Sequence, residues 1–190
     1  LWYRRQRQMC IRDRINPCDY NQTKNATIAI AEHIGPVYLR FGRPKWPIFT
    51  EDNEPFIIGK AKKFVEGNDV TIFATGHMVW QALEAEKILY QKGVSAEIIN
   101  IHTIKPIDKE AILKSISKTG CAISCEEHNI LGGLGESISR IISENNPIPF
   151  KVLGVNDSFG ESGKPIDLLS KYGLDPKNIC KFALDVIKRK

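Results

Sequence analysis

The sequence lacks the features that would mark a membrane, nucleotide-loop or zinc protein. No apolar run approaches the ~18 residues of a membrane span, and no signal peptide is recognisable. The GxGxxG and GxxxxGK[ST] loops are missing, and SFGESGK (158–164) is only partly like the second. The five cysteines are odd in number and follow no zinc spacing. We therefore expect a cytoplasmic protein with reduced, mostly buried thiols, no structural metal and no contact with a membrane.

The excess of positive charge is concentrated at the start of the chain. The formal net charge is +5, but residues 1–14 hold five arginines against one aspartate, which leaves the rest of the chain almost neutral. The string MCIRDR (9–14) also matches the translation of a transposase sequencing adaptor. We interpret residues 1–14 as an assembly artefact rather than a nucleic-acid-binding arm, so no nucleic-acid partner is predicted.

One stretch organises the remaining sequence, CAISCEEHNILGGLGES (121–137). Its apolar first part predicts a buried strand, and Glu126, Glu127 and His128 stand at the carboxyl end of that strand. Three glycines follow and lead into an amphipathic helix. Glycines in this place allow a tight turn and close helix–strand packing more readily than they indicate a phosphate site. The three glycines are Gly132, Gly133 and Gly135.

Strands and helices alternate on both sides of this stretch. Buried strands are predicted at Val70–Ala74, Ala96–Ile101 and Phe150–Val155. Asp108 is a predicted helix N-cap, and prolines open two closing helices. Short connections between alternating elements require parallel strands with right-handed crossovers. Residues 57–190 should therefore form a three-layer α/β/α domain with a mostly parallel sheet, with room for an antiparallel edge strand over Phe56–Val65.

A smaller unit precedes this domain. Residues 15–43 contain a helix, capped by Asp19 or Asn21, and then a short strand from Val37 to Phe41. These two elements cannot bury their own apolar faces, so we interpret them as the C-terminal remnant of a second α/β domain that is truncated at its start. Residues 44–56 are rich in proline and charge and read as a linker pinned by Trp46 and Phe49.

Several segments resemble the transketolase family. EEHNILGGLGES, ATGHMVWQALEA and NIHTIKPID are similar in order and spacing to the C-terminal domain of transketolases, and PCDYNQTKNA with GPVYLRFGRP resembles the end of their pyrimidine-binding domain. The resemblance extends from about residue 16 to the end of the chain. It is strongest to the small, separately encoded C-terminal subunit of split bacterial transketolases.

The resemblance implies a function for the complete enzyme. It implies transfer of a two-carbon ketol unit from a ketose phosphate to an aldose phosphate, with thiamine diphosphate and Mg²⁺. The GDG motif that would hold the diphosphate and the metal is not in the sequence. The fragment alone is therefore expected to bind no cofactor and to be inactive, with no catalytic residue of its own. It should need an N-terminal transketolase half, in a homodimer or a heterotetramer of two copies of each half.

The resemblance also implies one substrate contact. Arg43 stands where the family has an arginine that binds the phosphate of the sugar substrate, and Arg40 is a weaker candidate. A guanidinium group suits this role because its planar fork meets phosphate oxygens bidentately. Glu126, Glu127 and His128 are adjacent and should point in different directions, so we expect them to fix the glycine turn or a subunit interface. His77 and His102 have no second ligand at metal-binding spacing.

Three other interpretations stay open at this point. Deoxyxylulose-phosphate synthases and the β subunits of 2-oxoacid dehydrogenases share the fold more loosely, although the latter lack the phosphate-binding arginine. A non-catalytic interaction or regulatory module of the same fold is an alternative from another class. The string FGRP after GPVYLR and the helix with CDYNQTKNA favour transketolase.

Overall fold

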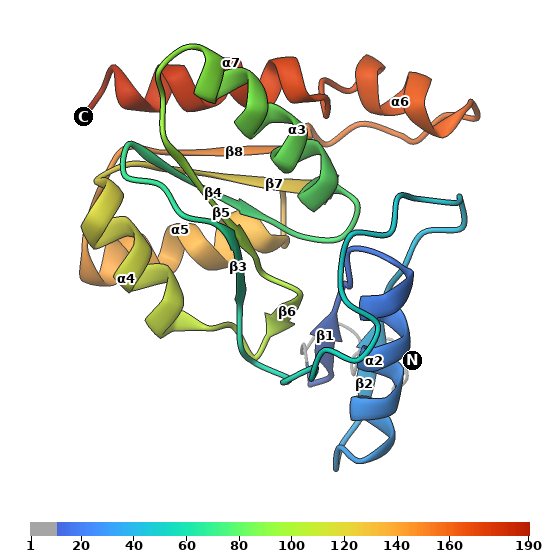
Figure 1. The fold of residues 1–190 in the computed structure, drawn as a ribbon. Helices are drawn as coiled ribbons and strands as arrows, with labels where there is room; N and C mark the ends of the chain where they lie inside the picture. The colour runs from blue at the N-terminus through green and yellow to red at the C-terminus, as the bar shows by residue number, and fades with distance from the viewer. Residues whose placement is uncertain (1–10) are drawn as a thin grey trace.

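Within residues 11–190, which the computed structural model describes, five strands form the main sheet (Figure 1). In order across the sheet they are β3 (Lys62–Val65), β5 (Ala96–Asn100), β4 (Val70–Ala74), β7 (Ala122–Asn129) and β8 (Phe150–Val155). The last four are parallel, and β3 pairs antiparallel with β5 at one edge. The predicted parallel sheet and its antiparallel edge strand are confirmed, although β3 is shorter than predicted.

Helices cover both faces of this sheet. One face carries α3 (Met78–Gln91) and α7 (Pro176–Ile187), and the other carries α4 (Lys109–Thr119) and α5 (Leu134–Asn145). Alternation along β4 divides the core, because Ile72 packs in the α3–α7 layer and its neighbour Phe73 in the α4–α5 layer. The three-layer α/β/α architecture is therefore confirmed. No helix in the described part of the chain is long and apolar enough to cross a bilayer.

Local signals in the sequence set the ends of these helices. Asp108 accepts a hydrogen bond from the Ala111 amide at 3.1 Å and caps α4, as predicted. Gly120 ends α4 at φ +67°, a conformation that glycine adopts without strain. Asp175 caps α7 in the same way as Asp108, and Pro176 occupies the first turn. The short helix α6 (Pro165–Lys171) begins with a proline too.

A second, smaller sheet joins the start of the chain to the main domain. In the described residues its strand order is β2 (Val37–Leu39), β1 (Asp13–Ile15) and β6 (Thr103–Lys105). β1 is parallel to β2 and antiparallel to β6, which follows β5 of the main sheet. Neither β1 nor β6 was predicted. Two residues of β1 lie within the predicted adaptor segment 1–14, most of which lies outside the described residues, and its origin stays a prediction.

The helix of the small unit, α2 (Tyr20–Ala31), is tied to the segment that follows it. Asp19, one of the two predicted caps, accepts hydrogen bonds from the amides of Gln22, Phe49 and Thr50 at 2.7–2.9 Å. Phe49 also packs on Phe64 and Trp80 of the main domain, with ring centroids 5.6 and 5.5 Å apart. The predicted pinning of the linker by an aromatic side chain is therefore confirmed for Phe49.

His102 predicts a pH dependence of folding. Its side chain is buried beside Phe56, and burial, followed by the charge of Lys62, lowers its pKa from 6.5 to about 4. The unfolded chain takes up a proton below pH 6.5, whereas the folded chain does so only near pH 4, so stability falls as the pH drops through this window. The loss between pH 7 and 4.5 should be about 2 kcal/mol.

Urea unfolding at these two pH values measures the effect. The fall in unfolding free energy should be smaller in His102→Gln than in the wild type by this amount. His128→Gln, at an exposed histidine, should behave as the wild type does. An equal pH dependence in the wild type and His102→Gln would contradict the prediction.

Candidate functional site

Glu126 links the end of β7 to the start of α5. Its carboxylate is 1% exposed and accepts hydrogen bonds from the amides of Leu134 and Gly135, each at 2.8 Å. These amides belong to the first turn of α5, where backbone donors lack partners within the helix. Burial raises the pKa of Glu126, and the two amides oppose that rise. The Glu126 carboxylate therefore connects the end of β7 to the glycine turn by two backbone hydrogen bonds.

Two of the three glycines are required by close approach. A Cβ atom on Gly133 would lie 2.1 Å from Glu126 Oε2, and one on Gly135 would lie 2.4 Å from Val152 Cγ1. Gly132 has open space but a φ of +74°, which disfavours any side chain. Each glycine thus has a local structural reason, and the turn is filled by a protein carboxylate where a nucleotide loop would hold phosphate.

Glu126 and His128 line one cavity of about 260 Å³ with Arg14 and Arg40, whereas Glu127 does not line it. Glu127 and His128 are both exposed, and His128 Nδ1 lies 2.8 Å from the carbonyl oxygen of Asn129. Glu127 Oε2 lies 3.4 Å from His77 Nδ1, and the Glu127 carbonyl oxygen accepts a hydrogen bond from Arg40 Nη2 at 2.7 Å. The structure therefore does not bring the three adjacent side chains onto one ligand.

The two candidate phosphate-binding arginines differ in their surroundings. Arg40 is partly buried and bonded to the backbone of β7. Arg43 is exposed in a bend after β2 and makes no hydrogen bond or ion pair to any residue that the structure describes. It lines a hollow of about 500 Å³ together with Lys45, Trp46 and His77. Arg43 is therefore available to an anion in this hollow.

His77 holds the bend that carries Arg43. Its ring stacks on Trp46 with centroids 4.5 Å apart and an interplanar angle of 12°. On the other side of the bend, a Cβ on Gly42 would lie 2.0 Å from His77 Cε1. His77 stands at the N-cap position of α3, where its side chain makes no capping hydrogen bond. These contacts give His77 a packing role, and its side chain does not cap the helix.

The described residues form no metal-binding cluster and expose no cysteine thiol. No group of three or more His, Cys, Asp or Glu side chains there could hold a metal ion. Four free cysteines are buried, and desolvation raises the pKa of each thiol. They are Cys18, Cys121, Cys125 and Cys180. The chemistry that this geometry supports is therefore anion binding at the bend beside Arg43.

Sequence reasoning missed the partners that position this bend. Gly42 carries no pattern of its own, and the stacking of Trp46 on a histidine 31 positions later depends on the tertiary fold. Arg14 was also missed: its guanidinium lies against the glycine turn and donates to the Gly132 carbonyl at 3.3 Å. The one signal in the sequence was the presence of Trp46 and Phe49 in the linker, which predicted that these side chains pack against a domain.

The fold and the site define the class of protein. It is a three-layer α/β/α domain joined to a smaller unit that contains α2 and β2, with the exposed Arg43 in the bend after β2. Residues 59–179 match the family model of the transketolase C-terminal domain. The chain belongs to the transketolase family.

Similar proteins agree with this assignment. The chain is 45% identical over 179 residues to a protein from Methanocaldococcus jannaschii described as a transketolase C-terminal section, covering 92% of this chain and 55% of that protein. It is 42% identical over 174 residues to a 6-deoxy-6-sulfo-D-fructose transketolase subunit from Clostridium sp. (strain MSTE9), covering 92% and 54%. The chain spans about half the length of these relatives.

A solved structure matches the fold closely. It is a split-gene transketolase described as an inactive β4 tetramer, with a TM-score of 0.91 and 38% sequence identity. The match covers 94% of this chain and 58% of that chain. Because it includes the small unit as well as the main domain, the match extends to the region around Arg43.

Proposed function

We propose that this chain is the C-terminal part of a thiamine-diphosphate-dependent transketolase that moves a two-carbon ketol unit from a ketose phosphate to an aldose phosphate. The observation that carries the proposal is the similarity, over 92% of the chain, to a transketolase C-terminal section. The chain contributes scaffold and interface, and it is inactive alone. Its setting is the cytoplasm.

Arg43 binds the phosphate of the sugar substrate in this proposal. Its exposed guanidinium has no partner among the described residues, whereas Arg40 is already bonded to the Glu127 carbonyl. Lys45 lines the same hollow and adds a second positive charge. A phosphate oxygen pair would meet the planar fork of Arg43 bidentately. His77 and Trp46 keep the bend in place and so fix where that fork lies.

Thiamine diphosphate and Mg²⁺ would be held outside this chain. The described residues offer no metal-binding cluster, and no GDG motif occurs in the sequence, so they do not fit a cofactor site of their own. When bound in the complete enzyme, the cofactor supplies the carbanion chemistry. The residues of this chain then orient the substrate phosphate.

The partner is an N-terminal transketolase half, in a homodimer or a heterotetramer. Exposed large apolar side chains gather in the small unit, which favours a covered surface in the assembly. In the small unit they are Tyr20, Ile28, Ile34, Tyr38 and Phe41, and Ile11, Ile48 and Ile57 lie in the segments on either side of it, each more than half exposed. In the described part of the main domain such side chains are fewer and more scattered.

Reconstitution tests the proposal. The chain alone should show no ketol transfer, and a complete assembly that adds both the rest of the pyrimidine-binding domain and the cofactor-binding N-terminal half should turn over with thiamine diphosphate and Mg²⁺. Circular dichroism and size-exclusion chromatography confirm that the added chain is folded and associated. Association without turnover on any sugar phosphate would favour a non-catalytic interaction module of the same fold.

A further inference from the structure

The bend that carries Arg43 has few attachments to the rest of the protein. Residues 41–48 lie outside the helices and strands, and no hydrogen bond joins them to the other described residues. Pro44 and Pro47 restrict the backbone of this segment, including that of Arg43, which precedes a proline. The segment is therefore stiff, and its position depends on contacts that its neighbours and a few of its side chains make.

The start of the bend is tied to the carboxyl end of β7. Arg40, the residue after β2, donates its amide to the Ile15 carbonyl of β1 at 2.9 Å. Its guanidinium Nη2 donates to the Glu127 carbonyl of β7 at 2.7 Å. Because the donor is charged, this second hydrogen bond is stronger than a neutral one. Arg40 therefore connects the end of β2 to the main domain.

The bend itself packs on His77, at the start of α3. The Trp46 ring stacks on the His77 ring with centroids 4.5 Å apart, and a Cβ atom on Gly42 would lie 2.0 Å from His77 Cε1. Glu127 Oε2 lies 3.4 Å from His77 Nδ1. Glu127 thus contacts Arg40 through its carbonyl oxygen and His77 through its carboxylate.

We propose that His77 and Glu127 are positioning residues for the substrate phosphate, which act by fixing the bend that carries Arg43. This inference rests on the phosphate-binding role proposed for Arg43. Both residues belong to the main domain, which therefore takes part in substrate binding and is more than a scaffold. Loss of either side chain should weaken binding only of substrates that carry a phosphate.

Steady-state kinetics of the complete assembly test the proposal. His77→Ala should raise the KM for a phosphorylated substrate about three- to tenfold, because the bend loses the ring on which it packs. The value of kcat and the KM for an unphosphorylated substrate should each change by less than about twofold. His77→Phe keeps a ring for Trp46 to stack on and should recover most of the affinity.

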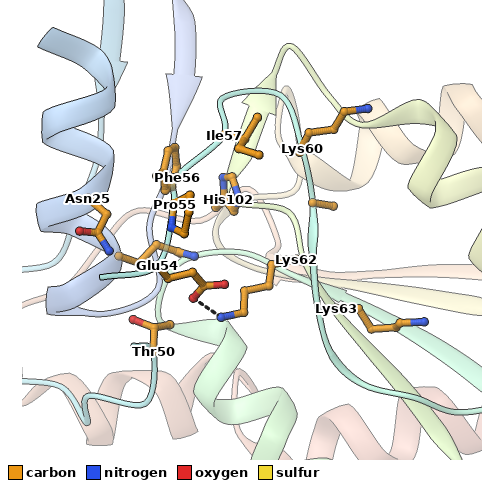
Figure 2. A pocket seen from close by; sticks show the side chains of 12 residues that line it. Asn25, Thr50, Glu54, Pro55, Phe56, Ile57, Lys60, Lys62, Lys63 and His102 are labelled. Atoms are coloured by element: carbon orange, nitrogen blue, oxygen red, sulfur yellow. Dashed lines mark hydrogen bonds and ion pairs between the residues drawn. The ribbon is translucent and has the colours of Figure 1, made fainter. Parts of the chain in front are cut away.

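Glu127→Gln should have a smaller effect, about two- to threefold on the same KM, since an exposed ion pair contributes little. Its matched control is Glu54→Gln. Glu54 also joins an irregular segment to the main domain, through an ion pair with Lys62 of β3 (Figure 2), and neither residue lines the hollow at Arg43. Glu54→Gln should leave the KM of both substrates unchanged.

A double variant shows whether His77 acts through Arg43. With Arg43→Gln already in place, His77→Ala should raise the KM for the phosphorylated substrate by less than about twofold further. Additive effects, or equal KM values in the wild type and His77→Ala, would overturn the positioning role while leaving the role of Arg43 intact. If Arg43→Gln alone changes no KM, the phosphate contact is wrong and this inference falls with it.

Gly42→Ala gives a second route to the same answer. The added methyl group would meet the His77 ring and displace the exposed bend without removing any side chain. Its KM for the phosphorylated substrate should rise about as much as that of His77→Ala, and thermal melting confirms that each variant is folded. If His77→Ala does not fold, an unchanged KM in Gly42→Ala would overturn the proposal by itself.

Discussion

Replacing Arg43 by glutamine should raise the KM of the assembled enzyme for a phosphorylated substrate by about 10- to 100-fold, with a smaller change in kcat. The expected size follows from the loss of a charge-assisted, bidentate hydrogen bond, about 1.5–3 kcal/mol. Arg43 makes no hydrogen bond or ion pair with other described residues, so the folded structure should lose little stability. Steady-state kinetics on the reconstituted assembly measure the change.

The same assay with an unphosphorylated substrate is the control for the Arg43 variant. The KM for the unphosphorylated substrate should change by less than about twofold, because this substrate has no phosphate group for Arg43 to bind. Arg43→Lys should recover part of the affinity, since an ammonium group keeps the charge but loses the fork. An equal change for phosphorylated and unphosphorylated substrates would contradict the role proposed for Arg43.

Replacing Glu126 by alanine should lower the unfolding free energy by about 3 kcal/mol. The variant leaves the buried amides of Leu134 and Gly135 without their acceptor and opens a space beside Gly133. Glu126→Gln should lose less, about 1–2 kcal/mol, because one amide oxygen can still accept a hydrogen bond. Urea unfolding monitored by circular dichroism gives both values.

Glu144→Ala is the matched control for the Glu126 variants. Glu144 lies in the last turn of α5, is exposed and makes no hydrogen bond or ion pair with the other described residues. Its loss should therefore change stability by less than about 0.5 kcal/mol. If Glu126→Ala were as stable as Glu144→Ala, the carboxylate would not be what closes the glycine turn.

Local sequence signals were sufficient to predict most of the strands and helices of the main domain. The strands at Val70–Ala74 and Phe150–Val155 have the predicted bounds, because each is a short apolar run between turn residues. Asp108 caps its helix as predicted, since capping depends on nearest neighbours along the chain. These features are local, so the sequence alone contains enough information to place them.

The parts that could not be predicted depend on contacts between distant segments. β1 and β6 are three residues each, too short for a period, and they pair across about 90 positions of sequence. The role of Arg43 came from the family resemblance, and its free position beside His77 needed the structure.

The central claim is that this chain completes a transketolase and not a related enzyme of the same fold. Turnover of the reconstituted assembly with two kinds of donor tests it most directly. A ketose phosphate with an aldose phosphate acceptor should react, and a 2-oxoacid donor such as pyruvate should not. Turnover with the 2-oxoacid donor and none with the ketose phosphate donor would contradict the account. It would assign the chain to a deoxyxylulose-phosphate synthase or a 2-oxoacid dehydrogenase β subunit.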